Sequence, residues 1–165
     1  MLQRMLTVAV MSCAVAGCAS HGWSGPELHD RAVSAGVSIR PGAPLSLDVE
    51  EGNGAIKVER DDALGEAKIA VVLRSPDQER VEQATLVSEV TDGVLRVRVE
   101  WPGGRRKDME SASLTITGPA FDGLTLKTGN GEITIADQSG PTKLTSGNGR
   151  VVARTHRGDI EIRTG

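Results

Sequence analysis

The chain has 165 residues, in which 19 Lys and Arg stand against 22 Asp and Glu, for a formal net charge of −3 at pH 7. This acidic balance argues against a nucleic-acid partner, because nucleic-acid-binding surfaces are basic. Two Trp, one Phe and no Tyr are present, so the core must consist of Val, Ile, Leu and Ala, which suits stacked strands with little depth between their faces.

Residues 1–17 have the pattern of an export signal. Arg4 supplies a positive charge, and residues 5–16 form an apolar run that is too short to cross a bilayer, which needs about 20 residues. The run ends in Val15-Ala16-Gly17-Cys18, which resembles the lipobox of bacterial lipoproteins. That resemblance implies cleavage between Gly17 and Cys18, followed by an acylated Cys18 (detectable with palmitate) as the first residue of the mature protein.

Two alternatives to acylation at Cys18 remain open. Cys13 is the other candidate, although the bulky Met11 before it fits the lipobox less well. The segment is also compatible with an ordinary secretory signal that happens to contain cysteine. If Cys18 carries lipid and Cys13 is removed, no disulfide is available to the mature domain. Ala19, rather than Asp, follows Cys18, which favours export to the outer membrane over retention at the inner one.

We expect a flexible tether in residues 18–35 and one β-strand repeat domain in residues 36–165. The tether is small and polar in residues 19–25 and has only a weak helical pattern after that. From residue 36 on, apolar and polar residues alternate, as in half-buried strands.

Two local signals interrupt these strands. Ser75 or Asp77 could cap one or two helical turns near residues 76–84, with Pro76 tolerated near their start. Thr91-Asp92-Gly93 separates two alternating runs, which is typical of a β-hairpin.

The most polar loop of the domain spans residues 101–110 and contains Arg105-Arg106-Lys107. One interpretation is an anion contact, with phosphate or lipopolysaccharide as the ligand. The other is a solvated loop tip, which the neighbouring Asp108 and Glu110 favour.

The end of the chain, residues 128–165, is a repeat. Its G-N-G units begin 18 residues apart, and pairs of apolar positions recur every nine residues, which predicts short strands joined by tight corners. Corners need positive φ, which Gly adopts freely and Asn tolerates. Asn130 and Asn148 could also stack as an amide ladder. The predicted structural corners are Gly52, Asn53, Gly54, Gly129, Asn130, Gly131, Gly147, Asn148, Gly149 and Gly158.

These spacings favour an all-β solenoid with two strands in each 18-residue coil, and an antiparallel β-meander or sandwich is the alternative. A hexapeptide helix is excluded because Ser139 and Thr145 occupy two of its aliphatic positions. A calcium-binding nonapeptide roll is excluded because Ile133 and Val151 stand where its Asp ligands belong. We expect no metal and no cofactor, since the histidines are too scattered for a zinc site; they are His21, His29 and His156.

The G-N-G units at Gly52, Gly129 and Gly147, the related residues 157–160 and the helix-like insert before residues 86–90 resemble an adhesin-like bacterial family of β-strand repeats. The function of that family is unknown, and the resemblance covers about residues 36–165. It implies a right-handed β-helix-like fold on secreted or surface proteins, and it transfers no catalytic residues.

We therefore expect a non-enzymatic, lipid-anchored envelope protein that binds a glycan, a matrix component or an envelope protein. Two other functions remain open, namely a regulatory or sensory module that contacts a membrane protein and a polysaccharide-acting enzyme. The enzyme would need paired carboxylates, but the available acids alternate with buried Ile residues, which indicates solvent-facing positions; they are Glu132, Asp137, Asp159 and Glu161. The C-terminal strand edge at residues 160–165 has no polar cap, which leaves three alternatives in this order: an earlier segment shields it, a partner or a second copy docks there, or the chain is a fragment.

Overall fold

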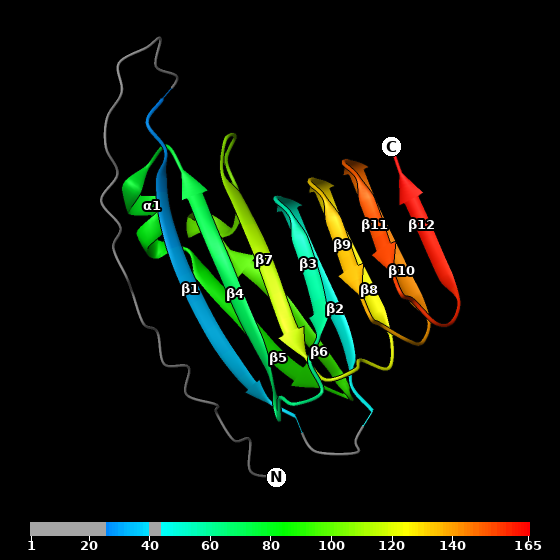
Figure 1. The fold of residues 1–165 in the computed structure, drawn as a ribbon. Helices are drawn as coiled ribbons and strands as arrows, with labels where there is room; N and C mark the ends of the chain where they lie inside the picture. Colours follow the sequence, from blue (N-terminus) through cyan, green and yellow to red (C-terminus); the bar gives the residue numbers. More distant parts are fainter. Residues whose placement is uncertain (1–25, 40–43) are drawn as a thin grey trace.

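Strands dominate the computed structural model, which describes residues 26–39 and 44–165 (Figure 1). Sheet A has six strands in the order β1 (His29–Ser38), β4 (Glu66–Ser75), β7 (Ser111–Gly118), β3 (Ile56–Arg60), β9 (Ile133–Ala136) and β11 (Val151–Arg154). Sheet B has six in the order β12 (Ile160–Thr164), β10 (Thr142–Asn148), β8 (Leu124–Asn130), β2 (Ser46–Asn53), β6 (Val94–Glu100) and β5 (Thr85–Thr91). The two sheets share one hydrophobic core, so the molecule is a β-sandwich.

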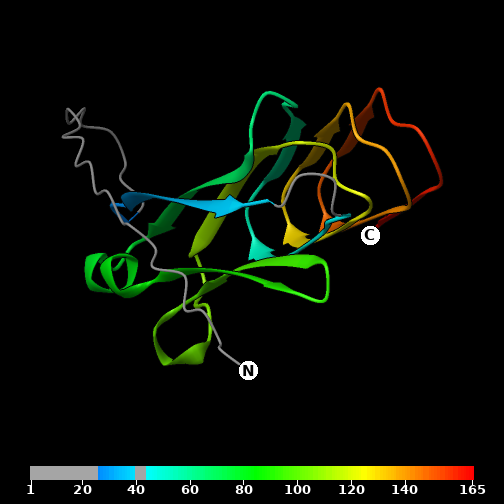
Figure 2. The same cartoon turned by 90° about the horizontal axis from the view of Figure 1, so that it is seen from below.

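In the C-terminal part, the chain changes sheet at every strand from β8 to β12, and neighbouring strands within each sheet run parallel. Leu126 pairs with Leu144, and Leu144 pairs with Ile162. The 18-residue period of the sequence is therefore the offset between parallel neighbours. Figure 2 shows these units as nested outlines, one behind another.

The N-terminal part is built differently, because β1, β4 and β7 are antiparallel neighbours and β5 and β6 form a hairpin. The prediction of one solenoid through residues 36–165 was therefore wrong, and the alternative of a sandwich fits, with mixed rather than antiparallel sheets. The physical reason is that parallel and antiparallel strands share the same two-residue alternation, so the pattern of apolar residues does not distinguish them.

The predicted tether ends earlier than Ala35. Residues 29–38 form β1, which pairs along its whole length with β4. The strand buries the side chains of Val33, Ala35 and Val37 on one face, and the residues between them are exposed. The segment with the weak helical pattern therefore forms a strand with a short apolar face. The folded domain begins before residue 36.

Two local predictions are confirmed. Helix α1 (Gln78–Gln83) begins after Asp77, whose side chain accepts a hydrogen bond from Arg80 N–H at 3.3 Å. The hairpin turn lies at Asp92 and Gly93, which both have positive φ, at 52° and 75°. Both features depend on residues close in sequence, which explains why the sequence predicted them.

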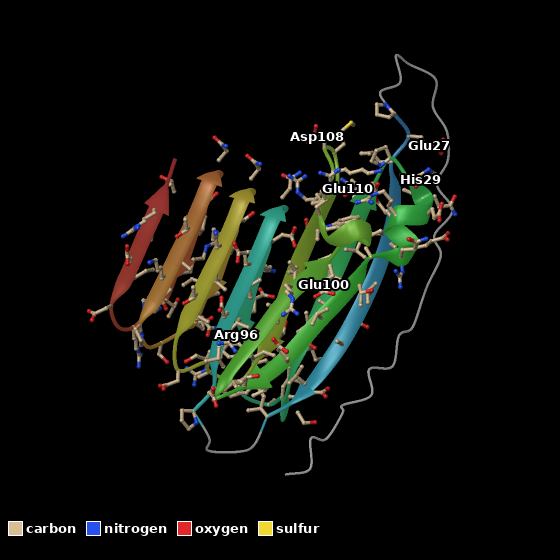
Figure 3. The ribbon with its side chains drawn as sticks, turned by 180° about the vertical axis from the view of Figure 1, so that it is seen from behind. Glu27, His29, Arg96, Glu100, Asp108 and Glu110 are labelled. Carbon is tan, nitrogen blue, oxygen red and sulfur yellow. The ribbon has the colours of Figure 1, made fainter. Side chains whose placement is uncertain are left out.

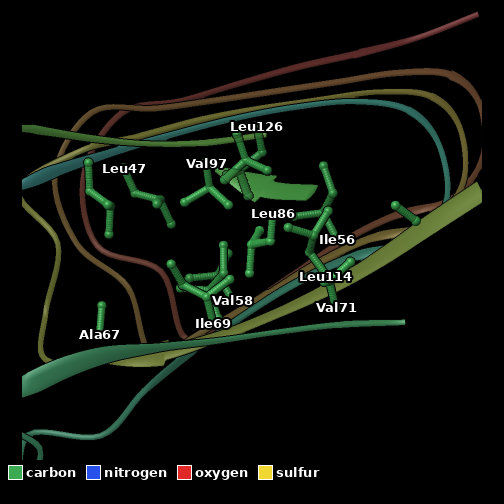
Figure 4. Packing of buried hydrophobic residues seen from close by; sticks show 14 of the residues in the cluster. Leu47, Ile56, Val58, Ala67, Ile69, Val71, Leu86, Val97, Leu114 and Leu126 are labelled. Atoms are coloured by element: carbon green, nitrogen blue, oxygen red, sulfur yellow. The ribbon is translucent and has the colours of Figure 1, made fainter. Parts of the chain in front are cut away.

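The core lies between the inward faces of the two sheets. Burying each large aliphatic side chain contributes about 1.5–3 kcal/mol to stability. Sheet B supplies Leu47, Val97 and Leu126, and these face residues of sheet A in Figure 4, among them Ile56, Val58, Ile69, Val71 and Leu114.

Candidate functional site

The three G-N-G corners stack at one end of the strands. Asn53 pairs in register with Asn130, and Asn130 pairs with Asn148. Asn148 Nδ2 donates to Asn130 Oδ1 at 2.9 Å, and Asn53 Nδ2 donates to the carbonyl of Glu110 at 3.1 Å. The predicted amide ladder thus forms between Asn148 and Asn130, while the Asn53 amide ties the loop of residues 101–110 to its corner.

The glycines of these corners serve mainly to let backbones approach each other. A Cβ atom on Gly129 would lie 2.4 Å from the Gly52 carbonyl oxygen, and one on Gly147 would lie 2.5 Å from that of Gly129. A Cβ on Gly131 or Gly149 would meet a carbonyl oxygen at 2.0 Å. Real Cβ atoms do not approach oxygen so closely, so no other residue fits without a shift of the backbone.

The expected reason, positive φ, holds at only some of the predicted corners. Among the described residues, φ is not positive at Gly129, Gly147 or Gly149, nor at the corner asparagines. Gly54 and Gly131 do have such a φ, at 143° and 158°. Gly158 (φ 119°) belongs to a different corner, between β11 and β12, where it stacks on Gly140 (φ 86°) and not on the G-N-G units.

The residue before each G-N-G unit is polar but buried. Thr128 and Ser146 are each 1% exposed and Glu51 is 5% exposed, and they occupy equivalent inward positions of β8, β10 and β2. Thr128 Oγ1 donates to the Gly54 carbonyl at 2.9 Å, and Ser146 Oγ donates to the Gly131 carbonyl at 3.0 Å. The hydroxyls thus provide hydrogen-bond donors to partly buried corner carbonyls.

Glu51 is the exception in this row, because a carboxylate replaces the hydroxyl. Its Oε1 accepts hydrogen bonds from Gly52 N–H at 2.9 Å and from Asn53 N–H at 3.4 Å. Burial raises the pKa of Glu51 from 4.5 to about 7, although the two N–H groups and the charge of Arg106 act in the opposite direction. The sequence analysis did not single out this residue; the signal was an acid in the slot that elsewhere holds Thr or Ser.

A cavity of about 550 Å³ opens beside this acid, and we call it the Glu51 cavity. The end of β2 supplies Glu51, the end of β6 supplies Arg98 and Glu100, and the following loop supplies Trp101, Arg105 and Arg106. The indole N–H of Trp101 is buried and has no hydrogen-bond partner within the described part of the chain. Acids and guanidinium groups therefore line the cavity together, and the carboxyl group of Glu51 among them is buried.

The loop of residues 101–110 is not a freely solvated tip. Glu110 is 1% exposed and forms an ion pair with Arg80 of α1, which also donates to the Pro102 carbonyl at 3.0 Å and the Arg105 carbonyl at 2.9 Å. Burial alone would raise the pKa of Glu110, but Arg80 and Lys107 N–H lower it below its usual value. Figure 3 shows Glu110 beside α1.

This anchoring fixes the loop backbone and, among the loop cations, Arg106. Arg106 Nη1 donates to the carbonyls of Lys107 and Glu110, each at 2.9 Å, and its side chain lies against Gly52. Arg105 and Lys107 remain exposed. These contacts argue against the interpretation as a freely solvated tip, because hydrogen bonds hold the loop to α1 and to Glu110; the anion contact stays a prediction.

The predicted lipidation and cleavage residues, Gly17 and Cys18, lie outside the described residues, as does Cys13. Residues 26–39 and 44–165 include no helix with the length and apolar character that membrane crossing requires. The same ranges hold no group of three or more His, Cys, Asp or Glu side chains arranged to share a metal ion. Glu132, Asp137, Asp159 and Glu161 are all exposed.

No family model and no curated protein matches the chain. Among solved structures, it is similar to a proposed cell adhesion protein from Clostridium sporogenes, at 9% identity over 80% of this chain and 99% of that one, with a TM-score of 0.44. A proposed adhesin from Bacteroides fragilis matches at 12% identity over 79% of this chain and 61% of its own length, also at 0.44. A proposed lipid-binding protein from Parabacteroides distasonis matches at 14% identity over 79% and 59%, at 0.42. All three TM-scores lie below 0.5, so these similarities do not assign a function to this chain.

Proposed function

We propose that the chain is a non-enzymatic, lipid-anchored protein of the bacterial cell envelope that binds a glycan in the Glu51 cavity. The supporting observation is that both guanidinium and carboxylate groups line this cavity, among them Arg98, Glu100, Arg105 and Arg106. Sugar hydroxyls both donate and accept hydrogen bonds, so they match cationic donors placed beside anionic acceptors. The volume of about 550 Å³ also lies within the usual range for ligand pockets, about 300–1,000 Å³.

The lining residues would have different roles in binding. Arg106 is held by two carbonyls and offers donors in a fixed orientation, whereas the exposed Arg105 adapts to the ligand. Glu51 has a pKa of about 7, so near neutral pH its carboxyl accepts a hydrogen bond in one protonation state and donates one in the other. The pocket therefore offers both hydrogen-bond donors and acceptors, as a hydroxyl-rich ligand requires.

Binding of the purified chain to an array of envelope and matrix glycans tests this function. We expect retention of at least one glycan, with an affinity that falls about tenfold in Arg105→Ala, the loss expected for one charge-assisted hydrogen bond. Arg154→Ala is the matched control, since Arg154 is an exposed arginine on β11 and does not line the cavity. If no glycan is retained, or if both variants bind as the wild type does, the proposal is wrong.

The membrane anchor is the second part of the proposal and rests on Val15-Ala16-Gly17-Cys18. With lipid on Cys18, the sandwich would stand close to the membrane surface, on the short segment before β1. Replacement of Cys18 by Ser should abolish palmitate labelling and release the chain from the membrane fraction, while Cys13→Ser should change neither. Unchanged labelling in Cys18→Ser would refute the anchor without affecting the glycan proposal.

A further inference from the structure

Strand β12 ends sheet B, with β10 on one side and no described strand on the other. Gly165 N–H donates to the Ser146 carbonyl at 3.1 Å, so the odd-numbered residues of this segment direct their main-chain groups toward β10. Main-chain groups alternate sides along a strand. The N–H and C=O groups that point to the free edge are therefore those of Ile160, Ile162 and Thr164.

The same residues carry exposed apolar side chains. Ile162 pairs with Leu144 of β10 and so faces the interior side of the sandwich. Leu144 is 0% exposed, but Ile162 is 47% exposed and Ile160 is 40% exposed. The strand also contains no proline and no inward-facing charge, which are the usual devices that protect a sheet edge. Strand β12 therefore has both main-chain groups without a described partner strand and exposed apolar side chains.

We propose that β12 pairs with β12 of a second copy of this chain, antiparallel and centred on Ile162. In this register Ile162 lies opposite the second copy's Ile162, and Ile160 lies opposite its Thr164. These are the residues whose main-chain groups point to the free edge, so each pair exchanges both of its N–H···O=C bonds. The exposed isoleucines of the two copies then cover each other.

The charges of the outer face select this register. Glu161 lies opposite the second copy's Arg163, and the two-fold symmetry makes this pair occur twice. Within one chain, Arg163 Nε already lies 2.6 Å from Glu161 Oε1, at the partly exposed outer face. A register centred on Glu161 or on Arg163 would instead place like charges directly opposite each other. The strand is thus complementary to itself in backbone, apolar and charged groups, which identifies a second copy as its partner.

The mass of the full-length chain, measured by light scattering over a range of concentrations, tests this interface. The chain carries Cys18→Ser, so that lipid does not drive association. We expect a monomer–dimer equilibrium whose dissociation constant rises about tenfold in Glu161→Arg and in Arg163→Glu, because each change places two like-charged pairs at the interface. The double variant Glu161→Arg/Arg163→Glu should restore the wild-type constant.

The pair Lys57 and Glu59 provides a matched control. It has the same spacing on β3, a contact of 2.9 Å and similar exposure, but it lies inside sheet A. Glu59→Arg should leave the dissociation constant unchanged.

The exchange rates of individual amide hydrogens test the register of the pairing. The edge amides of Ile160, Ile162 and Thr164 should exchange more slowly as concentration rises, whereas those of Glu161 and Arg163, which face β10, should not change. A monomer at all concentrations, species larger than a dimer, or a double variant that stays dissociated would each overturn the proposal. Protection of the edge amides at every concentration would overturn it too, because the chain itself would then cover β12.

Discussion

Replacement of Glu51 by Gln is expected to stabilise the protein above neutral pH and to have little effect in weak acid. The folded-state pKa of about 7 exceeds the ordinary value of 4.5, so the folded protein holds this proton more tightly than the unfolded chain. The contribution of Glu51 to the stability of the fold is therefore full below pH 4.5. It falls as the pH rises toward 7 and stays at its minimum above that pH.

The magnitude follows from the two pKa values. Their difference, from 4.5 to about 7, corresponds to about 3 kcal/mol at about 1.4 kcal/mol per pH unit. Gln keeps an uncharged oxygen that can accept the hydrogen bond from Gly52 N–H, now 2.9 Å from Glu51 Oε1. Glu51→Gln should therefore raise the free energy of unfolding by about 2–3 kcal/mol at pH 8, and by less than about 0.5 kcal/mol at pH 4.5.

Urea unfolding at the two pH values, followed by tryptophan fluorescence, measures this difference, since Trp101 is buried in the folded domain. Glu50→Gln is the matched control, because Glu50 is the neighbouring acid but is 68% exposed beside Lys127. Its effect should stay within about 1 kcal/mol and should not depend on the protonation of Glu51. An equal effect of Glu51→Gln at both pH values, or destabilisation at pH 8, would refute the reasoning.

Two further predictions concern the corner and the loop. Gly129→Ala should destabilise the fold by about 3 kcal/mol or more, because its Cβ would lie 2.4 Å from a backbone oxygen; Gly65→Ala, where no atom lies within 4 Å, should change stability by less than about 1 kcal/mol. Arg80→Ala should cost about 3–5 kcal/mol, since it leaves Glu110 buried without its cation, whereas the surface arginine Arg74, paired with Asp30, should contribute at most about 1 kcal/mol. Urea unfolding measures both pairs of variants.

Each of these comparisons has an outcome that contradicts it. Equal losses in Gly129→Ala and Gly65→Ala would show that backbone approach does not explain the corner glycines. Equal losses in Arg80→Ala and Arg74→Ala would show that the ion pair at Glu110 does not hold the loop. The pKa of Glu110 is lowered, so its contribution is present above its unfolded pKa and is lost in acid, opposite to that of Glu51; a penalty in Arg80→Ala that persists in strong acid would point to lost packing instead.

Features that depend on neighbouring residues could be predicted from the sequence by itself. The Asp77 cap of α1, the turn at Asp92-Gly93 and the all-β class follow from local propensity and from the alternation of apolar residues. The 18-residue period also indicated which residues pair, because the strands of successive repeats lie parallel and in register. Leu126, for example, pairs with Leu144. The inward positions of Leu126 and Leu144 follow from the same alternation.

Other features were decided only by the tertiary structure, because they depend on contacts between residues distant in sequence. Antiparallel pairing with β4 makes β1 a strand, although its own pattern is weak. Glu110 is buried because Arg80, 30 residues away, reaches it from α1. Glu51 follows Leu47 and Val49 in the strand alternation and so faces inward, but only the assembled sheets, with β2 paired to β8, bury its carboxyl group and raise its pKa to about 7. Desolvation is a property of the packed surroundings and not of the residue itself, so the candidate site could not be found before the sheets were assembled.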